Sequence, residues 1–202
     1  MTSIERTAYP RFKRYFTNKE LESVYTPTKS EIAFGYSCTT GKTNFFNLIV
    51  LLKVFQRLGY FPKHEEIPAK IVEHIRSILK LPPEIVLGYS NRKTMSRHRN
   101  YIRDYLQVIA FDKQALHLTA VSVYRSAQIM DNPADLINVA IEELVRVRYE
   151  LPGFNTLDRL VRHIRYLVNQ KLFALVINSL DRSRIKRLDD LLDTHPDRGK
   201  KL

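Results

Sequence analysis

The stretch that decides the fold runs from Asn44 to Leu58 and reads NFFNLIVLLKVFQRL. Its apolar residues recur at spacings of three and four, which places them on one face of an α-helix. The residues of this face are Phe45, Leu48, Ile49, Leu52 and Phe55. The same spacing returns along almost the whole chain, whereas the alternation of apolar and polar residues that is typical of strands is nearly absent. The sequence therefore predicts an all-α protein.

The composition is that of an ordinary globular chain, with 44% hydrophobic and 27% charged residues among 202. It excludes a disordered, collagen-like or rod-like coiled-coil protein. A chain of this length can bury a core as one large domain or as two small ones. We expect two helical modules with helix-turn-helix-like units: an N-terminal basic module over residues 1–110 and a second module over residues 111–202.

Positive charge exceeds negative charge by a wide margin. Lys and Arg number 33 against 21 Asp and Glu, so the formal net charge is +12. Most of this excess lies before residue 110, and it favours a polyanionic partner, above all a nucleic acid. The single cysteine, Cys38, is typical of a reducing compartment. The longest unbroken apolar run, Leu172–Ile177, is six residues, where a membrane span needs about 20. We therefore expect a cytoplasmic protein.

A helix from Ser90 or Asn91 to about Val108 is the most informative segment of the chain. One arc of this helix is predicted to be buried; it holds Met95, His98, Ile102, Tyr105, Leu106 and Ile109. The other side carries five cations and no acid between positions 91 and 103. In a major groove, Arg pairs with guanine and Asn with adenine. The candidate DNA-binding residues of this side are Arg92, Lys93, Ser96, Arg97, Arg99, Asn100 and Arg103. The alternative is a charged face that is merely solvated.

Contacts to phosphates are expected from three other places. The opening segment interleaves aromatic and cationic residues, which suits a phosphate backbone, although its rings could equally pack on the first helices. A loop near residue 42 carries another cation. The last long helix, expected over residues 156–180, combines basic residues with a sustained apolar face. The candidate phosphate-binding residues are Arg11, Lys13, Arg14, Lys42, Arg159 and Arg162.

Motifs for catalysis or metal binding are missing from the sequence. The segment from Gly35 to Thr43 looks like a phosphate-binding loop, but five residues separate its first glycine from the Gly-Lys pair, where a P-loop has four. His64 lacks the second histidine of a zinc peptidase, and Cys38 lacks an activating neighbour. No acid cluster is competent to hold two metal ions. We therefore expect no catalytic residue, no metal and no cofactor, with a nucleotide-dependent enzyme as a disfavoured alternative.

A set of short motifs follows in a specific order from about Tyr15 to Leu192. The motifs are Phe16-Thr17 to Leu21, Tyr25-Thr26-Pro27-Thr28, Asn44 to Leu52, Tyr60-Phe61-Pro62, Gly88-Tyr89, Arg92, Arg97-His98, Ile102, Leu106, Glu143-Leu144, Leu151-Pro152, Thr156-Leu157, Arg159-Leu160 and Leu188-Asp189-Asp190-Leu191-Leu192. This ordered set resembles the opening of the Tn-three family of transposases, the large replicative enzymes of bacterial class II transposons. Gln107 and Val108 depart from the family, which commonly has a glycine and an aromatic residue there, so the turn after the arginine-histidine helix is expected to differ.

The resemblance implies an N-terminal DNA-binding region that recognises the terminal inverted repeats of the element, with double-stranded DNA as its partner. In that family the strand-transferring carboxylates lie in a ribonuclease-H-like domain much further along a longer chain. The resemblance therefore implies a non-catalytic region that stops before the catalytic domain, self-association through regions outside this sequence, and a location at the bacterial nucleoid. Two other hypotheses stay open: a stand-alone DNA-binding regulator, and a helical scaffold for proteins whose charge only keeps it soluble.

Overall fold

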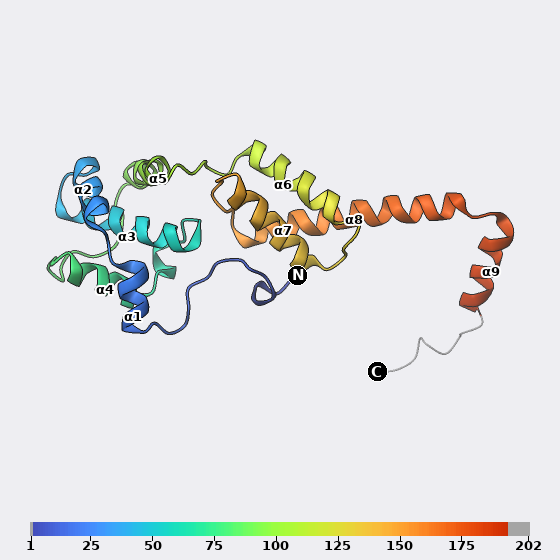
Figure 1. Cartoon of the computed structure of the whole chain (residues 1–202), viewed down its shortest axis with the longest axis horizontal. Coiled ribbons are helices and arrows are strands. Elements are labelled where there is room, and N and C mark those ends of the chain that lie inside the picture. The colour runs from blue at the N-terminus through green and yellow to red at the C-terminus, as the bar shows by residue number, and fades with distance from the viewer. Residues whose placement is uncertain (1, 194–202) are drawn as a thin grey trace.

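The computed structural model describes residues 2–193, apart from the side chains of Arg182, Leu188 and residues 191–193. The last nine residues of the expected second module therefore lie outside the described part. Within residues 2–193 the chain forms α-helices and no β-strand, so the prediction of an all-α fold is confirmed. The helices are α1 (Asn18–Glu20), α2 (Lys29–Cys38), α3 (Lys42–Leu58), α4 (Ala69–Ile78), α5 (Arg92–Leu106), α6 (Lys113–Ser126), α7 (Pro133–Arg146), α8 (Phe154–Ser179) and α9 (Arg182–Asp193). Figure 1 shows α1 to α5 in one lobe and α6, α7 and the first half of α8 in another.

Helix α3 forms the centre of the first lobe. Twelve of its 17 residues are buried, and it lies between Gly41 and Gly59, whose φ angles of 83° and 72° are accessible to glycine at little cost. Helices α2, α4 and α5 pack around it. The sequence predicts one apolar face, but the surrounding helices cover α3 on nearly all sides. As a result, Asn47 and Lys53 are buried as well.

A buried ion pair joins α2 to α3. The Nζ atom of Lys53 lies 3.3 Å from both carboxylate oxygens of Glu31. The side-chain amide of Gln56 and the backbone N–H of Thr28 each donate a hydrogen bond of 2.7 Å to the same carboxylate. Burial raises the pKa of Glu31, but these two hydrogen bonds and the charge of Lys53 outweigh burial and hold the pKa below its ordinary value. Glu31 is therefore a buried carboxylate in its charged form.

Helix α2 packs closely on α3 at Gly35. A Cβ atom at this position would lie 2.7 Å from the ring of Phe45 and 2.8 Å from the side chain of Ile49. These distances are shorter than van der Waals contact, so only glycine allows the two helices to pack at this separation. The glycine that looks like the start of a phosphate-binding loop thus has a packing role within a helix.

The second lobe is a bundle of α6, α7 and the first half of α8. Its core consists mainly of apolar side chains from α7 and α8, among them Leu136, Ile137, Leu144, Leu157 and Val161. The N-terminal arm joins this core, because Tyr9 is buried there and its hydroxyl donates to the carbonyl of Pro152 at 2.8 Å. The arm therefore contacts the second lobe before the chain enters the first.

Backbone hydrogen bonds tie the two lobes together. The N–H of Ile109 donates to the carbonyl of Arg148, and the N–H of Glu150 donates back to Ile109, each at 2.8 Å. The N–H of Leu151 donates to the carbonyl of Gly59, also at 2.8 Å. Gln107, where the sequence departs from the resembled family, ends α5 in the left-handed conformation, with a φ angle of 53°. Helix α5 therefore ends at Leu106, and the chain then passes from the first lobe to the second.

The second half of α8 extends beyond the bundle towards α9 (Figure 1). Every residue from Lys171 to Ser179 is exposed, including Phe173 at 61% and Ile177 at 58%. The apolar face that the sequence predicts along this helix is therefore buried only in its first half, where Val161, Ile164 and Val168 enter the core. No helix in the described part of the chain is long and apolar enough to cross a membrane.

Candidate nucleic-acid interface

Helix α5 lies along one edge of the first lobe (Figure 1). It begins at Asn91, whose side chain accepts a hydrogen bond of 2.8 Å from the N–H of Lys93. His98 and Ile102 are buried and anchor the helix on α3. The exposed side chains of the opposite face are Arg92, Lys93, Ser96, Arg97 and Asn100. Five of the seven candidate DNA-binding residues of this helix are thus accessible along one face.

The other two candidates of α5, Arg99 and Arg103, lie against the protein. Their guanidinium groups stack over the ring of Phe61, with centroid distances of 5.2 and 5.3 Å. Arg103 also forms an ion pair of 2.8 Å with Glu150 and donates at 2.8 Å to the side-chain oxygen of Asn100. Helical periodicity groups Arg99 and Arg103 with the exposed cations. It cannot reveal their contacts with Phe61 and Glu150, because these residues are distant in the sequence. The structure thus separates five exposed residues from two that stabilise the helix.

His98 is a core residue beneath this surface, as the sequence predicts. It is 1% exposed, and its Nδ1 atom lies 2.5 Å from the hydroxyl of Tyr89. Burial, assisted by the positive charge of Arg97, lowers the pKa of His98 from 6.5 to about 4. The imidazole is therefore neutral at pH 7 and adds no charge to the basic face.

The stability of the protein should depend on pH through His98. The unfolded chain takes up a proton near pH 6.5, whereas folded His98 resists protonation until about pH 4. The contribution of His98 to the free energy of unfolding is therefore fully present above pH 6.5. It falls by on the order of 2–3 kcal/mol as the pH drops through this window. Denaturant titrations from pH 7.5 to 4.5 measure this slope, and the H98Q variant should have a shallower one. Identical slopes for the two proteins would assign the pH dependence to other groups.

The loop before α3 faces α5 across a groove of about 310 Å³. Thr40 and Asn44 line one side of the groove, and Arg97 lines the other. Lys42, which lies between Thr40 and Asn44 in the sequence, is exposed at the first position of α3. The structure thus brings the Lys42 segment and the basic face of α5 together. Helix α2 precedes this loop where a P-loop would require a strand, so the loop differs from a P-loop in its structural context as well as in its spacing.

The N-terminal candidates lie elsewhere. Arg11 forms an ion pair of 3.7 Å with Glu5, and Lys13 pairs with Glu20. Arg14 is exposed next to them. Figure 1 shows the arm and α1 along the edge of the molecule opposite α5. The arm is therefore separated from the basic face of α5.

The two candidate phosphate-binding residues of α8 already interact with residues of their own helix. Arg162 forms an ion pair of 3.0 Å with Asp158, which is buried and also accepts a hydrogen bond from the N–H of Thr2. Arg159 is exposed, and its Nε atom donates to the carbonyl of Asn155 at 3.3 Å. The cationic surface of α8 is thus weaker than its sequence indicates.

Both lobes fall within one known family. Residues 1–164 match the family model described as a domain of unknown function, DUF4158. The chain belongs to the DUF4158 family. The match extends through the bundle of the second lobe and ends within α8, before the exposed second half of that helix.

This DUF4158 chain is also similar to a longer protein, the transposase for transposon Tn1546 from Enterococcus faecium, with 23% identity over 189 residues. The similarity covers 92% of the chain and 18% of the transposase. The chain therefore spans less than a fifth of the length of this relative.

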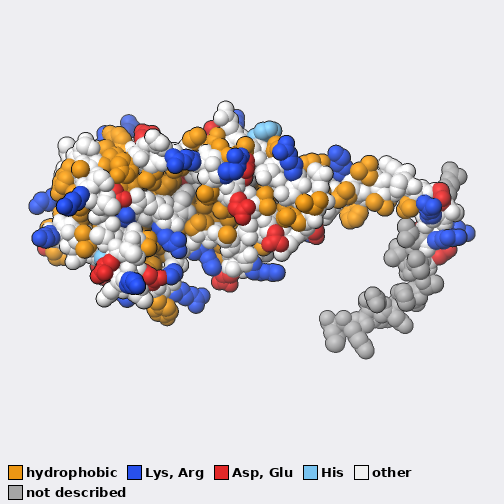
Figure 2. Space-filling model, in the orientation of Figure 1, with side chains coloured by type: hydrophobic (Ala, Val, Ile, Leu, Met, Phe, Trp, Pro, Cys, Tyr) orange, Lys and Arg blue, Asp and Glu red, His pale blue; other side chains and the backbone are white. Residues whose placement is uncertain are grey.

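Cationic and amide side chains lie exposed on the surface of the DUF4158 chain. Figure 2 shows Lys and Arg side chains recurring along the edge formed by α5 and α6. Among residues 2–193, no group of three or more His, Cys, Asp or Glu side chains is placed to hold a metal ion. The described surface thus offers cations and amides, which are the groups that bind phosphates and base edges.

Proposed function

We propose that this chain is a non-catalytic region that binds double-stranded DNA and recognises the terminal inverted repeats of a transposon, as part of a transposase. The observation that carries the proposal is the face of α5, where Arg92, Lys93 and Arg97 are exposed together with two polar residues. The net charge of +12 and the similarity to a transposase support it. A stand-alone DNA-binding regulator would use the same surface.

The dimensions of α5 suit the major groove. The helix has 15 residues and is about 22 Å long, and a major groove about 12 Å wide admits one α-helix. Arg97 and Asn100 lie three positions apart on one face, so both reach the floor of a groove that the helix enters. We assign Arg97, Ser96 and Asn100 to base edges. Arg92 and Lys93 at the start of the helix, and Lys42 across the groove beside it, would contact phosphates.

Arg99 and Arg103 are positioning residues in this proposal. Arg103 donates to the oxygen of Asn100, and this oxygen keeps a second lone pair with which to accept from adenine. The stacking of both arginines on Phe61 fixes the rotation of α5 relative to the lobe. The reading side chains are therefore held in place before DNA binds.

A helical scaffold for proteins is the second candidate function. The exposed apolar residues of α8, including Phe173, Leu175 and Ile177, favour it because apolar patches often mark protein contacts. The two functions differ in their dependence on salt, since an apolar contact releases few counterions.

A fluorescence-anisotropy titration tests the proposal. The full chain is titrated into a duplex that carries a terminal inverted repeat and into a scrambled duplex of equal length, at 50 to 200 mM salt. With about 6 to 10 phosphate contacts, the logarithm of the binding constant should fall against the logarithm of the salt concentration with a slope near −5 to −9. Both strands should stay intact when Mg²⁺ or Mn²⁺ is added. Salt-independent affinity would contradict DNA binding and favour the scaffold.

A further inference from the structure

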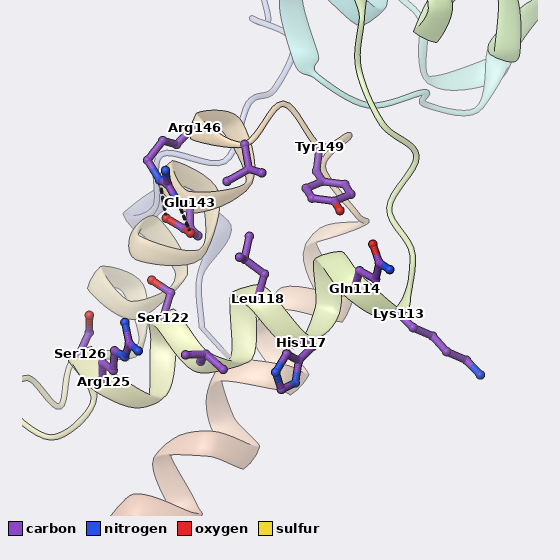
Figure 3. Close-up of a pocket in the computed structure, with 12 residues that line it drawn as sticks. Lys113, Gln114, His117, Leu118, Ser122, Arg125, Ser126, Glu143, Arg146 and Tyr149 are labelled. Atoms are coloured by element: carbon purple, nitrogen blue, oxygen red, sulfur yellow. Dashed lines mark hydrogen bonds and ion pairs between the residues drawn. The ribbon is translucent and has the colours of Figure 1, made fainter.

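A groove runs between α6 and the end of α7 in the second lobe. It encloses about 1000 Å³ (Figure 3). Leu118 and Val121 of α6 and Val147 contribute apolar lining, and cationic side chains occur along its length. None of its lining residues is among the candidates that the sequence indicates.

Helix α6 supplies cations without acids to this groove. Lys113 and Arg125 lie near the two ends of the helix and are exposed, with His117 between them. No Asp or Glu occurs from residue 113 to residue 126. Lys113 and Arg125 are about 18 Å apart along the helix axis. This distance equals the axial length of about five phosphates on one DNA strand.

The acid of the opposite wall is already engaged. Glu143 accepts two hydrogen bonds from Arg146, of 2.9 and 2.7 Å. These hydrogen bonds, with the charges of Arg146 and Arg125, hold the pKa of Glu143 below its ordinary value. Arg146 pairs with this carboxylate, and Arg125 lines the same part of the groove without an ion pair of its own to it, so positive charge is in surplus at this end of the groove.

The groove follows directly after the basic face of α5. Six residues, 107–112, join α5 to α6, and the hydrogen bonds of Ile109 to Arg148 and Glu150 hold this crossing. Figure 1 shows α5 and α6 one after the other along the same edge of the molecule. A duplex that lies along this edge can contact both helices.

We propose that the groove of α6 and α7 is a second DNA site, in which Lys113 and Arg125 contact the phosphate backbone of the duplex that α5 reads. The inference rests on the proposed function and adds a sequence-independent contact to it. The same groove chemistry would also suit an acidic peptide, but the spacing of the cations and the continuity with α5 favour a duplex.

The test compares two variants that each remove two positive charges. The variant K113A/R125A changes the groove. The control, K70A/K80N, changes exposed residues in and after α4, which lies on the other side of α3 from α5 (Figure 1). Asn is chosen at residue 80 because Lys80 has a φ angle of 51°, which Asn tolerates. Thermal unfolding by circular dichroism verifies that both variants are folded.

The groove variant should weaken binding to the inverted-repeat duplex and to the scrambled duplex by the same factor. Its salt slope should be less steep by about two, one for each phosphate that the variant no longer binds, whereas the control should keep the wild-type slope. A wild-type slope in the groove variant, or an equal change in the control, would overturn the second site while leaving the α5 proposal intact. Weaker binding to the inverted repeat alone would overturn the backbone role. Polyglutamate binding that K113A/R125A abolishes, with DNA binding unchanged, would assign the groove to a peptide.

Absence of salt-dependent DNA binding by the wild-type chain would refute the proposed function itself, and the second site with it. If only the second site is wrong, the wild-type chain still binds the inverted-repeat duplex, and the variant R97A still weakens that binding. The two failures are therefore distinguishable within one set of titrations.

Discussion

The double variant R97A/N100A is expected to lose roughly 2–6 kcal/mol of discrimination between the inverted repeat and a scrambled duplex. Each side chain can form a bidentate pair with a base edge, worth about 1–3 kcal/mol, and the range assumes that the two effects add. Both side chains are exposed on α5, so the fold should not depend on them. Competition titrations with the two duplexes measure the effect.

Two single variants serve as controls for this prediction. R99A removes the same charge from the same helix, but Arg99 stacks on Phe61 and should contribute about 0.5–1 kcal/mol to stability rather than to discrimination. K42A should weaken binding to both duplexes equally and make the salt slope less steep by about one. If R99A removes discrimination and R97A/N100A does not, Arg99 leaves Phe61 to read bases, as helical periodicity predicts.

The K53M variant is expected to lower the free energy of unfolding by about 3–5 kcal/mol. Lys53 and Glu31 are both buried, so the variant leaves a carboxylate without its cation inside the lobe. The remaining hydrogen bonds from Thr28 and Gln56 satisfy only part of that charge. Urea denaturation followed by circular dichroism measures the destabilisation.

The double variant K53M/E31M tests the reason for this destabilisation. Replacing both partners removes the uncompensated charge, so most of the stability should return. A deficit of about 1 kcal/mol should remain, because Glu31 also caps the start of α2 through the N–H of Thr28. A double variant as unstable as K53M would show that packing of the Lys53 stem, rather than charge, governs this position.

Helix content follows from local sequence. The spacing of apolar residues predicts the helices, and a cap at Ser90 or Asn91 predicts the start of α5, because caps and periodicity depend on residues that are close in the chain. The structure places the cap at Asn91. The second half of α8 shows the limit of this inference. Leu172, Leu175 and Val176 continue the apolar spacing of the first half, yet they are exposed. Periodicity identifies a face that can be buried, but not whether another element covers it.

The candidate site divides in the same way. The sequence identifies α5 as the basic helix, and the exposure of Arg92 and Arg97 agrees with that prediction. It gives no sign that Arg99 stacks on Phe61, because this contact joins residues 38 positions apart. The stretch without acids from residue 113 to residue 126 is a signal that could have indicated α6. The division into modules at residue 110 and the DNA contacts themselves stay predictions.

The sequence by itself determined that this chain is helical, strongly basic and similar in its order of motifs to transposases. Each of these properties is carried by composition or by residues a few positions apart. Only the tertiary structure decided which cations face solvent and which lie against aromatic rings and carboxylates. It also decided that α5 and α6 share one edge, through the hydrogen bonds of Ile109 with Arg148 and Glu150. The reason is physical: the type of each side chain is set by the sequence, whereas its partners are supplied by segments that only folding brings together.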